Sequence, residues 1–275
     1  MTRILIVLSL LLLARAVPSG AASLPAEVLA DMARADVVLL GEIHDNPQHH
    51  LTQAEAVSAL APAAVVWEML TAEVAAKLTP EVIADPAVLA EVTDWGNSGW
   101  PPLALYLPVF QAVSEAAQYG ALVPRDAARG AMKTGAAEAF GENAARFGLT
   151  EPLAAGEQAE READQQENHC NAMPEAMLPM LVEIQRLRDA VLARAVLRAL
   201  DETGGPVAVI TGNGHARADR GVPVYLRRAA PEVSLYVLGQ SEAGQVSGVF
   251  DAVVDAPATE REDPCEAFLK SRGDQ

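Results

Sequence analysis

The chain has 275 residues, and its 37 acidic and 20 basic residues give a formal net charge of −17. This length, with 51% hydrophobic residues, is enough for one sizeable domain that folds around its own core. The negative charge repels nucleic acid and anionic membrane surfaces, which argues against a nucleic-acid-binding protein.

The segment 1–22 is predicted to be a signal peptide. A positive charge precedes a short apolar run at 4–13, and small residues follow at 19–23, which suits cleavage after Ala21 or Ala22. An N-terminal membrane anchor is the less favoured alternative, because the run is too short to span a bilayer comfortably. No cysteine lies near the cleavage region, so no lipid anchor is expected there. We therefore expect a periplasmic or secreted protein of the bacterial type.

The segment 23–275 is predicted to form a single α/β domain whose polar tail starts at about residue 255. Short apolar runs, typical of strands covered on both faces, alternate with segments of helical periodicity. This alternation predicts a parallel-rich central sheet flanked by helices, with helical insertions at 71–118 and 127–170. The expected strands are 36–40, 63–67, 121–124, 206–211, 233–238 and 248–254. The expected helices are 24–35, 48–60, 103–118, 127–148, 157–170, 174–202 and 222–228.

The chain has two cysteines, Cys170 and Cys265. In an oxidising compartment an even pair favours one disulfide, which would tie the tail to the helix expected at 157–170. Two free buried thiols are an alternative. A metal site at His169 and Cys170 is less favoured, because neighbouring residues on a helix point in different directions.

A polar turn rich in histidine follows the first expected strand. The turn at 41–50 contains three of the five histidines of the chain and two carboxylates, one of them on Glu42. Imidazole is readily used as a metal ligand, haem contact or proton shuttle near neutral pH. We therefore expect the function here, with His44 as the residue that contacts a ligand. His49 and His50, on the first turn of the next helix, are expected at the surface or behind the site.

Three other expected strands also end in polar residues. Glu68 follows the second strand, Arg125 and Asp126 follow the third, and His215 comes shortly after the fourth. In an open parallel sheet, ligands bind in the crevice beyond the carboxyl ends of the strands. We therefore expect these groups to meet those of the turn at 41–50 in one site.

Three kinds of chemistry fit these groups, and their spacing does not choose among them. The first is a divalent metal bound by imidazole and carboxylate groups, with Glu42, His44, Glu68 and His215 as ligands. The second is acid–base catalysis in a hydrolase, either an esterase or a peptidase, with His44 as base or metal ligand and Glu68 as its partner. The third is recognition of a cofactor such as haem, whose iron accepts His or Tyr and whose propionates accept His, Lys or Arg.

Several short motifs follow one another from about residue 30 to about residue 240. They are Gly41-Glu42-Ile43-His44-Asp45-Asn46, His49-His50, Trp67-Glu68, Ser98-Gly99-Trp100-Pro101, Gln185-Arg186-Leu187-Arg188-Asp189 and Gly212-Asn213-Gly214-His215-Ala216-Arg217. In this order the set resembles the ChaN-like haem-binding uptake family, which is grouped with the Tiki, TraB and erythromycin-esterase-like proteins. The combination is specific, whereas no single motif is.

This resemblance implies the α/β fold of the ChaN and erythromycin-esterase-like proteins and a periplasmic protein that binds haem or iron for uptake. It also implies a homodimer with two haems face to face and a tyrosine that ligates iron, for which Tyr106 is our choice. The cofactor-binding residues would then be Glu42, His44, Tyr106, His169 and His215. A receptor or transporter partner is not identified. We expect a binding protein rather than an enzyme, with the hydrolase as the alternative.

Overall fold

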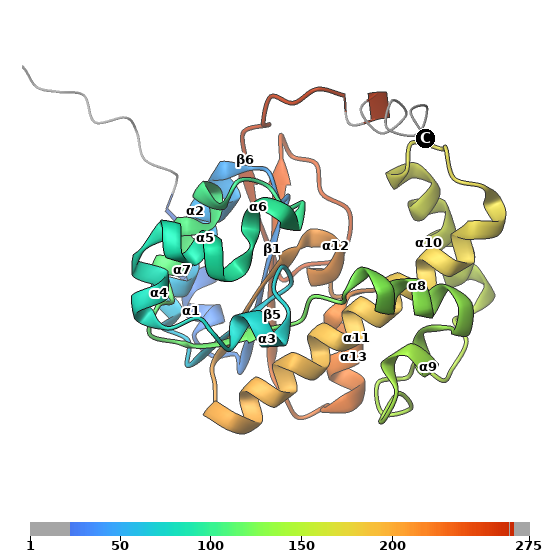
Figure 1. The fold of residues 1–275 in the computed structure, drawn as a ribbon, viewed down its shortest axis with the longest axis horizontal. Helices are drawn as coiled ribbons and strands as arrows, with labels where there is room; N and C mark the ends of the chain where they lie inside the picture. The colour runs from blue at the N-terminus through green and yellow to red at the C-terminus, as the bar shows by residue number, and fades with distance from the viewer. Residues whose placement is uncertain (1–22, 264, 267–275) are drawn as a thin grey trace, which may run out of the picture.

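A six-stranded parallel sheet with the strand order β3-β2-β4-β1-β5-β6 forms the centre of the protein (Figure 1). The computed structural model describes residues 23–263 and 265–266, so the predicted signal peptide at 1–22 lies outside the described residues. The strands are β1 (Val37–Glu42), β2 (Ala64–Trp67), β3 (Ala117–Gly120), β4 (Val207–Gly212), β5 (Leu235–Glu242) and β6 (Ala252–Ala256). The predicted fold class, a parallel-rich sheet flanked by helices, is confirmed.

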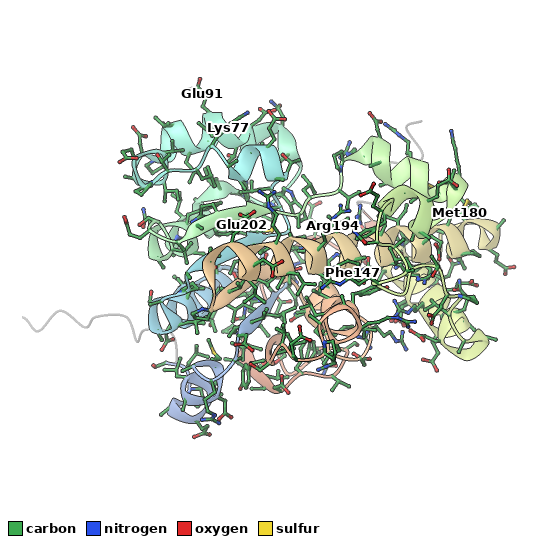
Figure 2. The ribbon with its side chains drawn as sticks, turned by 90° about the horizontal axis from the view of Figure 1, so that it is seen from below. Lys77, Glu91, Phe147, Met180, Arg194 and Glu202 are labelled. Carbon is green, nitrogen blue, oxygen red and sulfur yellow. A yellow bond between two sulfur atoms is a disulfide. The ribbon has the colours of Figure 1, made fainter. Side chains whose placement is uncertain are left out.

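Helices cover both faces of the sheet, and the longest of them, α11, runs along the molecule (Figures 1 and 2). The first half of the chain contains α1 (Ala26–Met32), α2 (Pro47–Leu60), α3 (Ala72–Ala75), α4 (Pro80–Ala84), α5 (Pro86–Thr93), α6 (Trp95–Ser98), α7 (Leu103–Ala112), α8 (Arg125–Thr134) and α9 (Ala136–Phe140). The second half contains α10 (Ala155–Asn168), the 3₁₀ turn η1 (Glu175–Met177), α11 (Leu178–Thr203), α12 (Asn213–Ala216) and α13 (Val222–Ala229).

Each face of the sheet has its own apolar cluster, because successive side chains of a strand point to opposite faces. Val37 and Leu39 of β1 face the side that α8, α9, α11 and α13 cover. Val38 and Leu40 face the side that α1, α2 and α4 to α7 cover. Burial on both faces explains why β1, β2 and β4 are nearly continuous apolar runs in the sequence.

The turn from β1 into α2 is fixed by its own residues. Asn46 is the N-cap of α2, and its side-chain oxygen accepts a hydrogen bond from the backbone N–H of Gln48 at 2.9 Å. Pro47 is the first helical residue, where its missing N–H costs nothing. Gly41 lets β1 approach α12 closely, since a Cβ there would lie 2.4 Å from the side-chain oxygen of Asn213. The turn is therefore held against the end of β4.

Four expected segments differ from the structure. The third strand is β3 rather than 121–124. It begins inside the segment 103–118, which was expected to be helical to its end. That helix, α7, ends at Ala112, and the edge strand that follows contains the polar residues Gln118 and Tyr119. The expected helix at 127–148 is divided into α8 and α9 at Gly135, whose φ of 84° is unfavourable for other residues. The last strand is β6 rather than 248–254.

The C-terminal tail passes from β6 over the sheet to the end of α10 (Figure 1). A disulfide between Cys170 and Cys265 holds it there, which confirms the predicted pairing over free thiols or a metal site. Arg261 in the tail forms ion pairs with Asp45 at 2.8 Å and with Glu242 at 2.7 Å. The tail thus connects the turn after β1 with α10. No helix among the described residues combines the length and apolar composition needed to cross a membrane.

Candidate functional site

The carboxyl ends of β1, β2 and β4 bring Glu42, His44, Glu68 and His215 together, as the sequence predicts. In the register of the sheet Glu42 lies beside Gly212, and the end of β2 lies beside β4. The short helix α12 begins directly after β4 and carries His215. All four side chains therefore lie at one edge of the sheet, where ligands bind in open parallel sheets.

Glu42 is the buried anchor of the site. One oxygen, Oε1, accepts hydrogen bonds from Nδ1 of His44 at 2.7 Å and from the phenol of Tyr106 at 3.0 Å. The other, Oε2, lies 3.2 Å from Nδ1 of His50. The imidazole of His50 is fully buried, and its Nε2–H donates to the backbone carbonyl of His44 at 2.9 Å. Glu42 thus fixes the orientation of the His44 ring from the buried side of the site.

Glu68 lies between two imidazoles. Its Oε2 is 3.9 Å from Nε2 of His44, and its Oε1 is 3.5 Å from Nε2 of His215. Oε2 also accepts hydrogen bonds from the hydroxyl of Thr211 at 2.7 Å and from the backbone N–H of Gly212 at 2.8 Å. These two donors hold the carboxylate in place at the end of β4.

A third carboxylate, that of Asp189 on α11, completes the chain of charges. Its Oδ1 accepts a hydrogen bond from Nδ1 of His215 at 2.6 Å, and the side-chain amide of Gln185 lies 3.1 Å from the same nitrogen. Because Nδ1 of His215 donates to Asp189, its Nε2 is directed toward Glu68. The site is therefore an alternating series of carboxylates and imidazoles from Glu42 to Asp189.

The neighbouring charges shift the pKa values of both partners. Burial alone would raise the pKa of Glu42, but hydrogen bonds from His44 and His50 outweigh it and lower that pKa to about 2. Burial opposes protonation of His44, yet Glu42 and Glu68 raise its pKa to about 9. Glu68 and Asp189 likewise raise the pKa of His215 despite its burial. The imidazole of His44 therefore carries positive charge at neutral pH.

A cavity of about 580 Å³ opens above these groups. His44, which has 29% of its side chain exposed, and His215 form part of its floor. Ile43, Trp100 and Val182 supply apolar walls. The ring of Trp100 lies 4.8 Å from that of His44, measured between their centroids. This volume lies within the range of small-molecule and cofactor sites, about 300–1,000 Å³.

Four arginines line the cavity, although the protein as a whole is strongly acidic. Arg161 pairs with Glu157, and both Arg217 and Arg220 pair with aspartates, the contact of each pair being 2.6 Å. Arg188 on α11 is exposed and has no acidic partner within ion-pair distance among the described residues. Its guanidinium is free to bind an anion that enters the cavity.

Two of the residues predicted to bind a cofactor do not line this cavity. The side chain of Tyr106 is fully buried, and its hydroxyl donates to Glu42; burial and this carboxylate raise the pKa of the phenol. His169 lies at the end of α10, where its Nδ1 is 2.7 Å from the carbonyl of Gln165. Gln165 lines the cavity, whereas His169 does not. Their roles as cofactor-binding residues remain predictions without support from this geometry.

The other candidates of the sequence have structural positions. His49 was expected at the surface or behind the site, and it is fully buried. Its Nδ1 accepts the N–H of Ile43, and its Nε2–H donates to the carbonyl of Ser241. Arg125 and Asp126 start α8 instead of following a strand, and the cavity-lining residues do not include them.

Within the described residues, no group of three or more His, Cys, Asp or Glu side chains is placed to hold a metal ion. The proposed ligands are engaged with one another, since Glu42 accepts from His44 and Tyr106, while Glu68 accepts from Thr211 and Gly212. The geometry therefore gives no support to the metal site predicted at Glu42, His44, Glu68 and His215.

Comparisons with known proteins agree with this architecture. The family model described as "Haem-binding uptake, Tiki superfamily, ChaN" matches residues 28–226. Among solved structures, ChaN of Campylobacter jejuni, described with cofacial heme binding, matches with a TM-score of 0.59 and 19% sequence identity over 80% of this chain and 87% of that chain. The type III effector HopBA1 matches with a TM-score of 0.48 and 13% identity over 84% of this chain and 92% of that chain. No curated protein matches the chain.

Proposed function

The chain belongs to the ChaN family of haem-binding uptake proteins in the Tiki superfamily, and on this premise we propose that it binds haem in the cavity above His44 and Glu68. The predicted signal peptide and the family together support a periplasmic protein that takes part in haem or iron uptake. The cavity is the part of the molecule that can be tested directly.

The residues of the cavity fit the carboxylates of haem. Haem is a flat apolar ring with two propionates, and the cavity combines apolar walls with positive groups. Arg188 has no acidic partner among the described residues, and His44 is protonated at neutral pH, so each can donate a hydrogen bond to a propionate. Bound haem would supply an iron centre for storage or transfer. The unpaired guanidinium of Arg188 in this cavity, in a protein of net charge −17, is the observation that carries the proposal.

The fit does not extend to a tyrosine ligand of iron. Tyr106 is buried beneath His44, and none of the cavity-lining residues in the described part of the chain is a tyrosine. Imidazoles are therefore the iron-ligating side chains that the cavity offers, and each must be neutral to bind a metal. We accordingly assign His44 to holding a propionate while it is protonated.

Haem titration followed by absorbance tests the proposal. Purified protein should shift the Soret band at micromolar haem, and His44→Ala should weaken binding by about tenfold or more, as expected for a lost charge-assisted hydrogen bond. Haem dimethyl ester, which lacks the free propionates, should bind more weakly than haem. Absence of a Soret shift in the wild-type protein would refute haem binding.

Fractionation of cells that express the full chain tests the periplasmic location, and light scattering with and without haem tests the homodimer.

A hydrolase is the second candidate, and the arrangement of Glu42, His44 and Glu68 is the observation that favours it. A histidine held by a carboxylate at the floor of a cavity is the usual arrangement for acid–base catalysis. Because the pKa of His44 is about 9, it would act as a general acid rather than a base at neutral pH. Esterase and peptidase assays with and without added divalent ions test this reading. Activity that survives in His44→Ala would contradict it.

A further inference from the structure

A second cavity, of about 730 Å³, lies beside the edge strand β3. It is formed by β3 and the residues that follow it, by α3, α8 and α9, and by one side of α11. We call it the β3 groove and define its apolar wall by Ala76, Ala121, Val123, Leu187, Val191 and Ala195. Nothing in the haem proposal uses it.

The spacing of residues on α11 explains why this wall is apolar with a charged rim. Leu187, Val191 and Ala195 are four residues apart and therefore lie on one face of the helix. Arg194 and Arg198 lie on the adjoining stripe and line the same groove. Figure 2 shows Arg194 and Glu202 along α11. The groove therefore combines a hydrocarbon-like wall with two guanidinium groups.

Of these two guanidiniums, only one is neutralised. Arg198 pairs with Glu202 at 2.8 Å, and Glu202 also accepts a hydrogen bond from Tyr119 at 2.7 Å. Arg194 lies over the ring of Phe140, 4.2 Å from its centroid, and donates to the Phe140 carbonyl at 3.2 Å. It has no acidic partner within ion-pair distance in the described part of the chain. Its pKa is lowered by burial, and no carboxylate offsets this effect.

A third cavity lies between the β3 groove and the cavity above His44. This cavity, of about 80 Å³, shares Ala121, Leu122 and Val123 with the groove. It shares Trp100 and Arg188 with the cavity above His44. The three cavities therefore lie next to one another along α11.

We propose that the β3 groove binds an amphiphilic monocarboxylate of the fatty-acid class, with its carboxylate on Arg194 and its hydrocarbon chain along Leu187, Val191 and Ala195. Charge complementarity selects this ligand. An unpaired guanidinium attracts a carboxylate by a charge-assisted, bidentate contact, and the apolar wall stabilises the chain in proportion to the buried area. The proposal does not depend on haem binding.

Isothermal titration calorimetry of the full-length protein with octanoate, dodecanoate and hexadecanoate, below micelle formation, tests the chain. We expect one site per protein and an affinity that rises about three- to fourfold for each additional buried methylene. Ala195→Trp fills the groove and should abolish this binding, whereas Ala30→Trp, on the exposed side of α1, should not change it. Many weak sites, or binding that Ala195→Trp leaves intact, would overturn the proposal. Thermal melting confirms that the variants are folded.

A comparison of dodecanoate with dodecanol tests the head group. Arg194→Gln should weaken dodecanoate by about tenfold and dodecanol by less than twofold, because only the carboxylate contacts the guanidinium. Arg34→Gln removes a charge of the same kind from the turn after α1 and should affect neither ligand. A loss of dodecanoate binding in Arg188→Gln but not in Arg194→Gln would place the carboxylate in the haem cavity and refute the assignment. Haem titration of Arg194→Gln should match that of the wild type, which separates this test from the proposed function.

Discussion

The carboxylate of Glu42 accepts a hydrogen bond from Nδ1 of His44 at 2.7 Å, although one residue separates the two in the chain. Glu42 is the last residue of β1, and His44 lies in the turn that follows the strand. The turn therefore brings the imidazole of His44 back onto the carboxylate of Glu42. This contact makes Nδ1 the donor and leaves Nε2 facing Glu68 and the cavity.

Glu42→Gln tests how far this contact controls the imidazole. Glutamine keeps the shape but removes the negative charge, so the pKa of His44 should fall from about 9 toward its ordinary value of 6.5. Titration of the His44 ring by NMR measures the change. At a pH between these two values, haem should bind more weakly to this variant than to the wild type. An unchanged His44 pKa would show that Glu68 alone supplies the shift.

Protonated His44 should also make the free energy of unfolding depend on pH. Its pKa is about 9 in the folded protein and 6.5 in the unfolded chain, so the stabilisation is fully present below pH 6.5 and is lost as the pH rises to 9. The shift corresponds to roughly 2–3 kcal/mol after allowance for partial exposure. Urea unfolding at both pH values measures it, with His44→Asn as the reference. Parallel pH profiles for the two proteins would contradict the assignment.

Gly212→Ala should damage the site by displacing the histidine. A Cβ at Gly212 would lie 2.9 Å from Nε2 of His44, so the imidazole would have to move away from Glu68. We expect haem affinity to fall by about tenfold or more, with a stability loss of about 1–3 kcal/mol. Gly130→Ala is the control, because a Cβ there meets no atom within 4 Å and Gly130 does not line the cavity. Equal haem affinities for the two variants would argue against a ligand at His44.

The central strands could be predicted because both of their faces are buried, which leaves a continuous apolar run for each. The edge strand β3 could not, since its residues are Ala-Gln-Tyr-Gly and are mostly only partly buried. Its polar residue Gln118 belongs there because its side-chain oxygen accepts a hydrogen bond from the indole of Trp67 at 2.7 Å. That contact joins residues far apart in the chain, and local pattern carries no sign of it.

The site was predictable as far as its residues lie at strand ends. Glu42, His44, Glu68 and His215 satisfy this condition, whereas Asp189 lies within a long helix and was assigned no role. The helical spacing of α11 did carry a signal, because it places Asp189 in the buried stripe of the helix. The other members of this stripe are Val182, Arg186, Ala193 and Val196. A carboxylate at such a position requires a buried partner, which is His215 here. The burial of Tyr106 depends on how α7 packs, and the sequence gives no indication of it.

The disulfide between Cys170 and Cys265 should stabilise the folded protein and slow the release of a bound ligand. It closes a loop with a sequence separation of 95 residues, for which the chain-entropy account predicts about 4–5 kcal/mol and measured disulfides give about 2–4. It also fixes the tail against α10, which carries the cavity-lining residues Arg161 and Gln165. Paired replacement of both cysteines by serine should therefore lower the free energy of unfolding by about 3 kcal/mol.

The same double variant should release haem faster, because α10 would no longer be tied to the turn after β1. On the sheet side, the tail is anchored by Arg261 to Asp45 and by its Pro257 carbonyl, which accepts a hydrogen bond from the Asn46 amide at 3.0 Å. Stopped-flow transfer of haem to an excess of acceptor protein measures the release rate. Arg261→Gln loosens only this anchor and should give an intermediate rate, since the disulfide still holds the tail on α10. Identical release rates for wild type and double variant would mean that α10 does not need the tail to keep its place over the cavity.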